Sequence, residues 1–237
     1  MSTRRVAVFG ASGAIGMALG RLFFDRNWDV VAITRTGRPT ADAMPGCDWF
    51  SWDPFVPGEE TLKGINQPFD AVVWTQGQNI NDSIQTFDAA AHAALYQANV
   101  VYIMQTLRAL LSCDLLAVPA KLCIISSIWQ NIARQNKLSY TVTKSALHGL
   151  VQSLAIDLGK DGHLVNAVLP GALDTPMTRA NLTLEQVKRL EEATPIGKLA
   201  TLDDVCNLTS FLCSSDNTGI TGQFIAADGG FSFARII

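Results

Sequence analysis

Short apolar segments alternate with longer amphipathic segments along nearly the whole chain. The short segments are rich in Val, Ile, Ala and Phe, and they are apolar on both faces. Strands of this kind belong to a parallel sheet that is covered by helices on both sides. Because strand–helix–strand crossovers are right-handed, the alternation predicts a doubly wound, Rossmann-like parallel sheet. We expect about seven strands, at residues 6–9, 30–33, 49–52, 71–74, 122–125, 164–169 and 223–226.

The amphipathic segments between the strands predict helices. They lie at residues 15–27, 84–111, 138–160 and 201–214, and residues 37–64 should be loops with at most a short helix beside the third strand. No linker or repeat divides the 237 residues. The sequence therefore predicts a single three-layer α/β/α domain over residues 1–237, with a cofactor-binding half at about 1–120 and a catalytic and substrate half at about 121–237.

Composition argues against several classes of protein. The net charge is -3 and the basic residues are not clustered, so neither nucleic acid nor an anionic membrane is an expected partner. The five cysteines lack CxxC spacing, which is typical of buried thiols in the reducing cytoplasm. The three histidines are far apart in the sequence, and we expect no metal site.

The N-terminal segment permits a second interpretation. Arg4-Arg5 precedes an apolar, glycine-rich stretch at residues 6–20, which resembles an export signal or a membrane helix. The stretch is too short to span a bilayer before Arg21 interrupts it. Its glycine spacing is better explained by a phosphate-binding loop.

That loop lies between the first predicted strand and the first predicted helix. Glycines let the backbone approach a pyrophosphate, and the free N–H groups of the helix N-terminus face its charge. The alternative is that the glycines only allow close packing of helix on strand. The predicted cofactor contacts here are Gly10, Ser12, Gly13, Ala14, Ile15 and Gly16.

The end of the second predicted strand bears on the choice of nicotinamide cofactor. NAD-binding proteins place a carboxylate there for the ribose hydroxyls, but this chain has none. Arg35 and Arg38 could instead pair with a 2′-phosphate, and Thr34 leaves room for it. NADP(H) is therefore the preferred cofactor, with NAD(H) possible if the arginines are only solvated loop residues. Asp53 could accept a hydrogen bond from the adenine amino group, or it could cap the turn before Pro54.

Tyr140 and Lys144 are four positions apart in a predicted helix, so they share one face. A free phenol has a pKa of about 10, and a neighbouring ammonium group lowers it. Such a pair can exchange a proton with a carbonyl or alcohol oxygen. Ser127, just after the fifth predicted strand, could hydrogen-bond the same oxygen. Taken alone, however, a Tyr and a Lys at this spacing are more often a solvated pair.

Taken in order, these motifs resemble the short-chain dehydrogenase/reductase family, in its short single-domain branch. The motifs are the glycine-rich turn, Ser127, residues 140–144, residues 166–171, residues 219–223 and residues 228–230. The resemblance covers essentially the whole chain. It implies that Tyr140 is the general acid in reduction and the general base in oxidation, and that Ser127 polarises the substrate oxygen. It implies further that Lys144 holds the nicotinamide ribose and lowers the tyrosine pKa, and that Asn99 anchors a proton-relay water to Lys144. Asn99 could alternatively be a helix-kink residue bonded to the backbone, which is compatible with the same role.

The resemblance also assigns residues around the nicotinamide and the substrate. Those expected beside the cofactor are Gly77, Pro170, Gly171, Thr175 and Met177, in addition to Tyr140 and Lys144. The segment Asp174-Thr175-Pro176-Met177 could alternatively be only a helix cap. Trp129 and Leu173 are expected in the wall of a largely apolar substrate pocket, together with Ser127 and Tyr140.

Three features of the sequence depart from the family pattern. Ala14 stands where the usual loop has Gly, and Gly13 where NADP-dependent members often have a basic residue. Trp74-Thr75-Gln76-Gly77 replaces the family's Asn-Asn-Ala-Gly after the fourth strand. Gly77 still allows close approach to the cofactor, and Thr75 can replace in part the asparagine that braces the sheet.

We therefore expect an NADP(H)-dependent oxidoreductase that interconverts a carbonyl and an alcohol on a small, uncharged substrate. A nucleotide-sensing protein without turnover is an alternative, although such proteins typically lose the Tyr or the Lys. An epimerase or dehydratase is another, although a longer C-terminal substrate region is expected of it. The apolar end at residues 231–237 suggests packing on a neighbouring subunit, in a homotetramer or homodimer.

Overall fold

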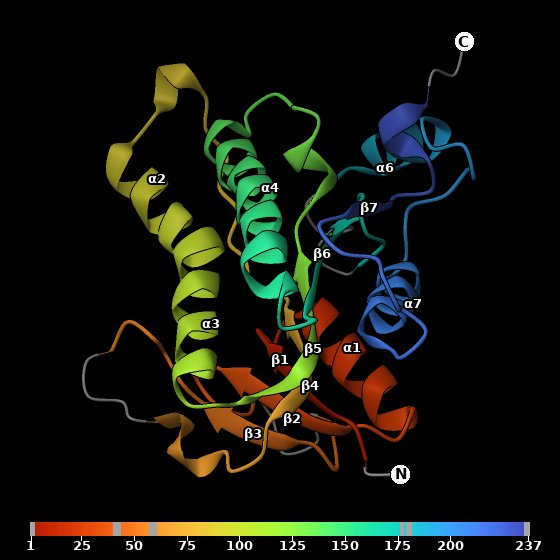
Figure 1. Cartoon of the computed structure of the whole chain (residues 1–237). Helices are drawn as coiled ribbons and strands as arrows, with labels where there is room; N and C mark the ends of the chain where they lie inside the picture. The colour runs from red at the N-terminus through yellow and green to blue at the C-terminus, as the bar shows by residue number, and fades with distance from the viewer. Residues whose placement is uncertain (1–2, 40–43, 57–60, 176–177, 179–181, 235–237) are drawn as a thin grey trace.

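A computed structural model describes residues 3–39, 44–56, 61–175, 178 and 182–234. It contains one sheet of seven parallel strands in the order β3-β2-β1-β4-β5-β6-β7 (Figure 1). The strands are β1 (Arg5–Phe9), β2 (Asp29–Thr34), β3 (Asp48–Ser51), β4 (Phe69–Trp74), β5 (Leu116–Ile125), β6 (Leu164–Pro170) and β7 (Phe224–Ala227). The doubly wound, Rossmann-like sheet predicted from the sequence is confirmed. The strand order reverses between β1 and β4, and ligands bind at this switch point in such sheets.

Helices cover both faces of the sheet. One face carries α1 (Ala14–Asp25) and α7 (Leu202–Cys213), and the other carries α3 (Tyr102–Ser112) and α4 (Leu138–Gly159) (Figure 1). Two further helices are α2 (Ala89–Tyr96) and α6 (Leu184–Glu192). The shorter helical turns are η1 (Thr61–Gly64), η2 (Ile84–Thr86), η3 (Gln97–Val101), η4 (Ile128–Gln130) and η5 (Phe231–Phe233).

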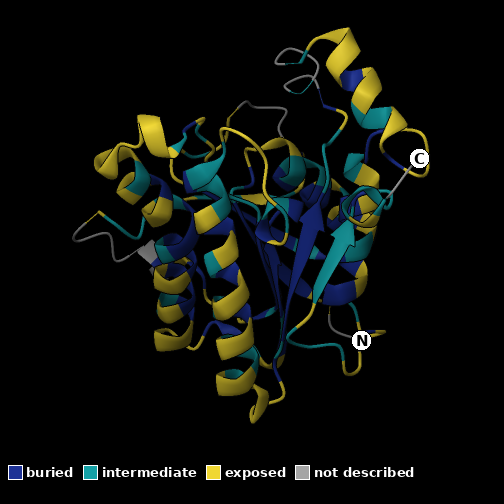
Figure 2. Cartoon of the chain, turned by 90° about the horizontal axis from the view of Figure 1, so that it is seen from above, coloured by how far each residue is buried: buried dark blue, intermediate teal, exposed yellow. Residues whose placement is uncertain are grey.

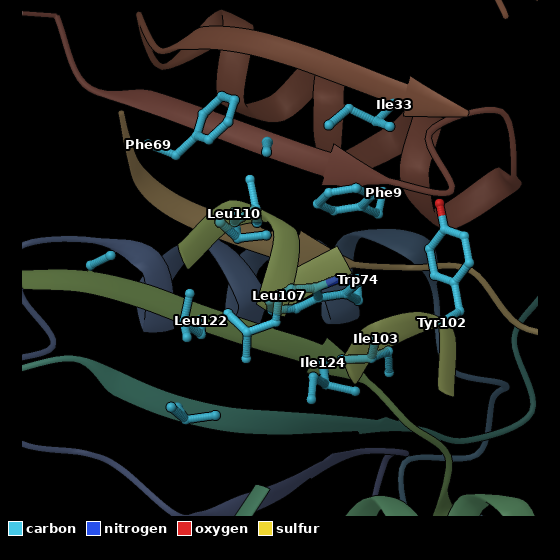
Figure 3. Close-up of a cluster of buried hydrophobic side chains, with 14 of the residues drawn as sticks. Phe9, Ile33, Phe69, Trp74, Tyr102, Ile103, Leu107, Leu110, Leu122 and Ile124 are labelled. Carbon is cyan, nitrogen blue, oxygen red and sulfur yellow. The ribbon is translucent and has the colours of Figure 1, made fainter. Parts of the chain in front are cut away.

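The core has two halves, one on each side of the sheet. Successive residues of β1 point to opposite faces, so Ala7 and Phe9 pack beneath α3 while Val6 and Val8 pack beneath α1. Phe9 stacks on Trp74 with ring centroids 5.8 Å apart, beneath the aliphatic residues of α3 (Figure 3). The central strands are buried and the outer helix faces are exposed (Figure 2). This is why the strand segments are apolar on both faces.

The largest difference from prediction is in the helix expected at residues 84–111. It is divided into η2, α2, the π-helical turn η3 and α3. Asp88 starts α2 by accepting a hydrogen bond from the backbone N–H of Ala91 at 2.8 Å. The π turn is only five residues long and lies between two α-helices, so the apolar pattern of residues 84–111 predicted helix across it. The short helix allowed at residues 37–64 is η1, and within the described ranges no helix is long and apolar enough to span a membrane.

Candidate active site and nucleotide cleft

A cavity of about 260 Å³ opens at the carboxyl ends of β1, β2 and β4, at the switch point of the sheet. Six of the predicted cofactor residues line it: Gly10, Ser12, Gly13, Thr34, Arg35 and Gly77. Ala14, Ile15 and Gly16 lie just behind, in the first turn of α1. The first turn of a helix has N–H groups without intrahelical partners, so α1 presents a site suited to an anion beside this cavity.

The three glycines of the loop serve different purposes. Gly10 has a φ of 75°, and a Cβ there would lie 2.5 Å from the backbone nitrogen of Gln76. A Cβ on Gly16 would lie 2.5 Å from the carbonyl oxygen of Gly10. Close packing therefore requires both. A Cβ on Gly13 would approach only the carbonyl oxygen of Gly10, at 3.4 Å. The packing interpretation thus accounts for Gly10 and Gly16, and it leaves Gly13 open for contact with a ligand.

Thr75 joins β4 to the end of β1. Its hydroxyl lies 2.8 Å from the carbonyl oxygen of Phe9 and 3.1 Å from that of Gly10, within hydrogen-bond distance of both. The threonine thus braces the two central strands at the position where the family has asparagine.

The end of β2 presents two of the three residues predicted to recognise a phosphate. Thr34 is buried, and its hydroxyl donates a hydrogen bond to the carbonyl oxygen of Gly37 at 2.8 Å. Arg35 is exposed and lines the cavity, whereas Arg38 is not among the lining residues. The Asp53 carboxylate accepts a hydrogen bond from the backbone N–H of Phe55 at 3.0 Å, as in the turn-capping alternative.

Tyr140, Ser127 and Lys144 come together at the end of β5. Ser127 follows the strand, and α4 carries Tyr140 and Lys144 on one face. The Lys144 ammonium lies 5.7 Å from the centre of the Tyr140 ring and donates a hydrogen bond to the carbonyl oxygen of Ile125 at 3.2 Å. Burial raises the pKa of Tyr140, and a hydrogen bond with Ser127 partly opposes this. Burial also lowers the pKa of Lys144 to about 8.

The sequence predicted that Lys144 lowers the pKa of Tyr140, and that role stays a prediction. In this structure burial raises the tyrosine pKa, which favours the neutral phenol. Lys144 is buried and Tyr140 is partly buried, so burial disfavours the charged form of each residue. A neutral phenol is the form that can donate a proton.

Asn99 lies in the π turn and connects it to the loop after β4. Its Oδ1 accepts a hydrogen bond from the backbone N–H of Gln78 at 2.8 Å, and its Nδ2 donates to the carbonyl oxygen of Gln78 at 3.1 Å and to Thr143 Oγ1 at 3.0 Å. A Cβ on Gly77 would lie 3.5 Å from Asn99 Oδ1 and 3.6 Å from Lys144 Nζ. Gly77 therefore lies between the cavity, which it lines, and the Tyr140–Lys144 pair.

The residues predicted after β6 pack tightly. A Cβ on Gly171 would lie 2.8 Å from the Cβ of Asp228, beside the buried end of β6 at Pro170. The Thr175 hydroxyl accepts a hydrogen bond from the backbone N–H of Thr178 at 3.2 Å, so it caps a local turn as the alternative proposed. Met177 lies outside the described residues.

Trp129 and Leu173, the two further residues predicted for the substrate pocket, lie in different segments of the chain. Trp129, on η4, packs edge-on against Phe231 with ring centroids 6.4 Å apart. Leu173 pairs with Ala200 in an isolated bridge. Both side chains are partly buried.

Several residues of the site had no role predicted from the sequence, among them Gln76, Tyr102 and Thr143. Gln76 and Tyr102 line the cavity, and Thr143 holds the amide of Asn99. Of these three, only Gln76 could have been noticed in the sequence, because it stands where the family pattern has alanine. The other two contacts depend on tertiary structure that periodicity does not encode.

Comparison with known proteins agrees with this architecture. Residues 60–232 match the family model described as "Enoyl-(Acyl carrier protein) reductase". An uncharacterized oxidoreductase of Bacillus subtilis is 27% identical, over 94% of this chain and 97% of that protein. An L-rhamnose 1-dehydrogenase (NADP(+)) of Thermoplasma acidophilum is 38% identical, over 48% of this chain and 45% of that protein.

Solved structures share the whole fold. A short chain dehydrogenase family protein from Francisella tularensis superposes with a TM-score of 0.84 at 26% identity, covering 98% of this chain and 99% of that one. The chain belongs to the short-chain dehydrogenase/reductase family. It is an enzyme of that family, an oxidoreductase that acts on alcohol and carbonyl groups with a nicotinamide cofactor.

Proposed function

We propose that this enzyme uses NADP(H) to interconvert a carbonyl and an alcohol on a small, uncharged substrate, with Tyr140 as general acid and base. The observation that carries the proposal is the partly buried Tyr140 phenol, hydrogen-bonded to Ser127 with the Lys144 ammonium beside its ring. Gly77, which lines the cavity at the switch point, lies close to Lys144 of this group.

In reduction, Ser127 and Tyr140 hydrogen-bond the substrate carbonyl oxygen and favour the negative charge that develops on it. The nicotinamide cofactor, when bound, supplies the hydride in reduction and accepts it in oxidation. Tyr140 gives its proton to the oxygen, so one C–H and one O–H bond form as the carbonyl is reduced. The Lys144 ammonium stabilises the resulting phenolate until a solvent proton restores the phenol. Asn99 would anchor a proton-relay water to Lys144, and its side-chain hydrogen bonds to the main chain of Gln78 hold it in place.

The described residues fit a dinucleotide. Gly10 and Gly13 let the backbone approach the pyrophosphate beside the N-terminus of α1, and Lys144 would hold the nicotinamide ribose. Pro170, Gly171 and Thr175 would flank the nicotinamide, together with Met177, which lies outside the described residues. The two halves of the chain, at about 1–120 and 121–237, would then supply the cofactor site and the catalytic and substrate site.

Arg35 supports the preference for NADP(H), because it is an exposed cation at the rim of the cavity and no carboxylate ends β2. Replacement of Arg35 by Ala should weaken NADPH binding about 10- to 100-fold, the range expected for one charge-assisted phosphate contact, and should leave NADH binding nearly unchanged. Calorimetric titration measures both. Tighter binding of NADH than of NADPH by the unaltered protein would rule out this preference.

Trp129 and Leu173 support an uncharged substrate, since they offer partly buried apolar surface rather than ionic anchors. The similarity to an enzyme named for L-rhamnose, a neutral sugar, agrees with this. The direct test is oxidation of NADPH by the purified protein, followed by absorbance, with a panel of neutral ketones, aldehydes and sugars. Turnover supports the proposal, whereas nucleotide binding without turnover of any compound would favour a sensing protein.

We also propose a homodimer or homotetramer in the cytoplasm. Apolar side chains are exposed along α3 and α4, at Met104, Leu111, Val142 and Ile156, and Phe233 is 81% exposed near the C-terminal end. Such surface is typical of subunit interfaces. The five cysteines are free thiols in this structure, which agrees with a reducing compartment.

A further inference from the structure

Gln76 has a side-chain amide whose two polar atoms are buried and unpaired. Its Nε2 and Oε1 are both shielded from solvent, and neither has a hydrogen-bond partner among the described residues. Buried polar groups in native proteins are nearly always hydrogen-bonded, because an unpaired amide loses its hydration without compensation. An unpaired amide at a cavity wall is therefore expected to have a partner that comes from outside the chain.

The position of Gln76 indicates which partner this is. The residue follows β4 and lines the same cavity as Gly13 and Arg35. A Cβ on Gly10 would lie 2.9 Å from the Cβ of Gln76, so the glutamine stands directly against the glycine turn. In a doubly wound sheet this turn faces the pyrophosphate, and the neighbouring end of β2 faces the adenosine ribose.

We propose that Gln76 is a nucleotide-binding residue, whose amide turns from its shielded position into the cavity and hydrogen-bonds the adenosine half of the cofactor at the pyrophosphate and the adjoining ribose. This inference rests on the proposed function. An amide suits both groups, because Nε2 can donate to a phosphate oxygen while Oε1 accepts from a ribose hydroxyl. NADP(H) and NAD(H) share these groups, so Gln76 contributes affinity for both nucleotides, whereas Arg35 distinguishes them.

Removing the Gln76 amide should leave the thermal stability of the nucleotide-free protein unchanged or raise it, while weakening nucleotide binding. In Gln76→Ala the unpaired amide is gone, so the nucleotide-free protein should melt at or above the temperature of the unaltered protein. Its dissociation constants for NADPH and NADH should both rise about tenfold, the effect of losing one or two hydrogen bonds. Gln76→Glu keeps the length of the side chain but faces the phosphates with a negative charge, so binding should weaken further.

Titration calorimetry with NADPH and with NADH, together with thermal melts of the nucleotide-free full chain, tests this. Gln85→Ala makes the same change at an exposed position outside the cavity and should alter neither constant. Arg35→Ala should weaken NADPH alone. Unchanged affinity in Gln76→Ala, or a lower melting temperature with unchanged affinity, overturns the inference while the proposed function stands. If the unaltered protein binds neither nucleotide, both fail.

Discussion

Lys144 brings an ammonium group into the interior with only 4% of its surface exposed. Its ammonium donates a hydrogen bond to the carbonyl oxygen of Ile125, and Tyr140 lies beside it. Burial lowers the lysine pKa from 10.5 to about 8. Keeping the Lys144 ammonium charged in the interior therefore lowers the stability of the folded protein. Such perturbed groups are common at catalytic sites.

This cost should be visible as a pH dependence of stability. Because the folded-state pKa is about 8 and the ordinary value is 10.5, the unfolded chain binds more protons between these pH values. The free energy of unfolding should then rise with pH, by about 2 kcal/mol from pH 7 to 9.5 for this one group. Urea denaturation of the unaltered protein and of Lys144→Met isolates the contribution. The advantage of the methionine variant should shrink as the pH rises, and an advantage that is constant with pH would contradict the burial of a charged lysine.

The turn between β1 and α1 combines packing and ligand approach in one element. Gly16 lies against backbone atoms of Gly10 and Ala11, so an added methyl group cannot be accommodated by a side-chain rotation. Gly13 caps α1 at the surface with an ordinary φ of -78°. The sequence predicted this element from its glycine spacing, but it could not assign the separate purpose of each glycine, which depends on the distance to β1 and β4.

Two matched substitutions separate these purposes. Gly16→Ala should lower the free energy of unfolding by about 1–3 kcal/mol, as overpacking does in well-packed interiors. Gly13→Ala should change it by less than about 0.5 kcal/mol, as at other surface positions, while weakening nucleotide binding. Chemical denaturation followed by circular dichroism measures both variants. Equal losses of stability would show that the turn packs differently from this description.

The π turn at Asn99 illustrates what the sequence leaves open at the scale of an element. Its side chain bonds the main chain of Gln78, which is 21 positions away. The apolar pattern of residues 84–111 predicted helix here, and most of the segment is helical. The break follows from a long-range polar contact, which periodicity cannot encode.

At the scale of the whole molecule, the sheet was predictable because its strands are buried on both faces. Seven expected strands are present, although β5 begins at Leu116 rather than at residue 122. Its first half has exposed residues and a register shift opposite β4, so it lacked the apolar pattern used for prediction. The Tyr140–Lys144 pair could be predicted from spacing and order, whereas the direction of the tyrosine pKa depends on burial.

The central claim is that the fold places Tyr140 to exchange a proton with the substrate oxygen. Its most direct test is single-turnover reduction by Tyr140→Phe, with saturating NADPH and a carbonyl compound that the unaltered enzyme reduces. We predict that NADPH binding stays within about threefold, because the ring is retained, while the reduction rate falls at least about 100-fold, the usual contribution of a positioned general acid. Reduction at the full rate by Tyr140→Phe would contradict the account.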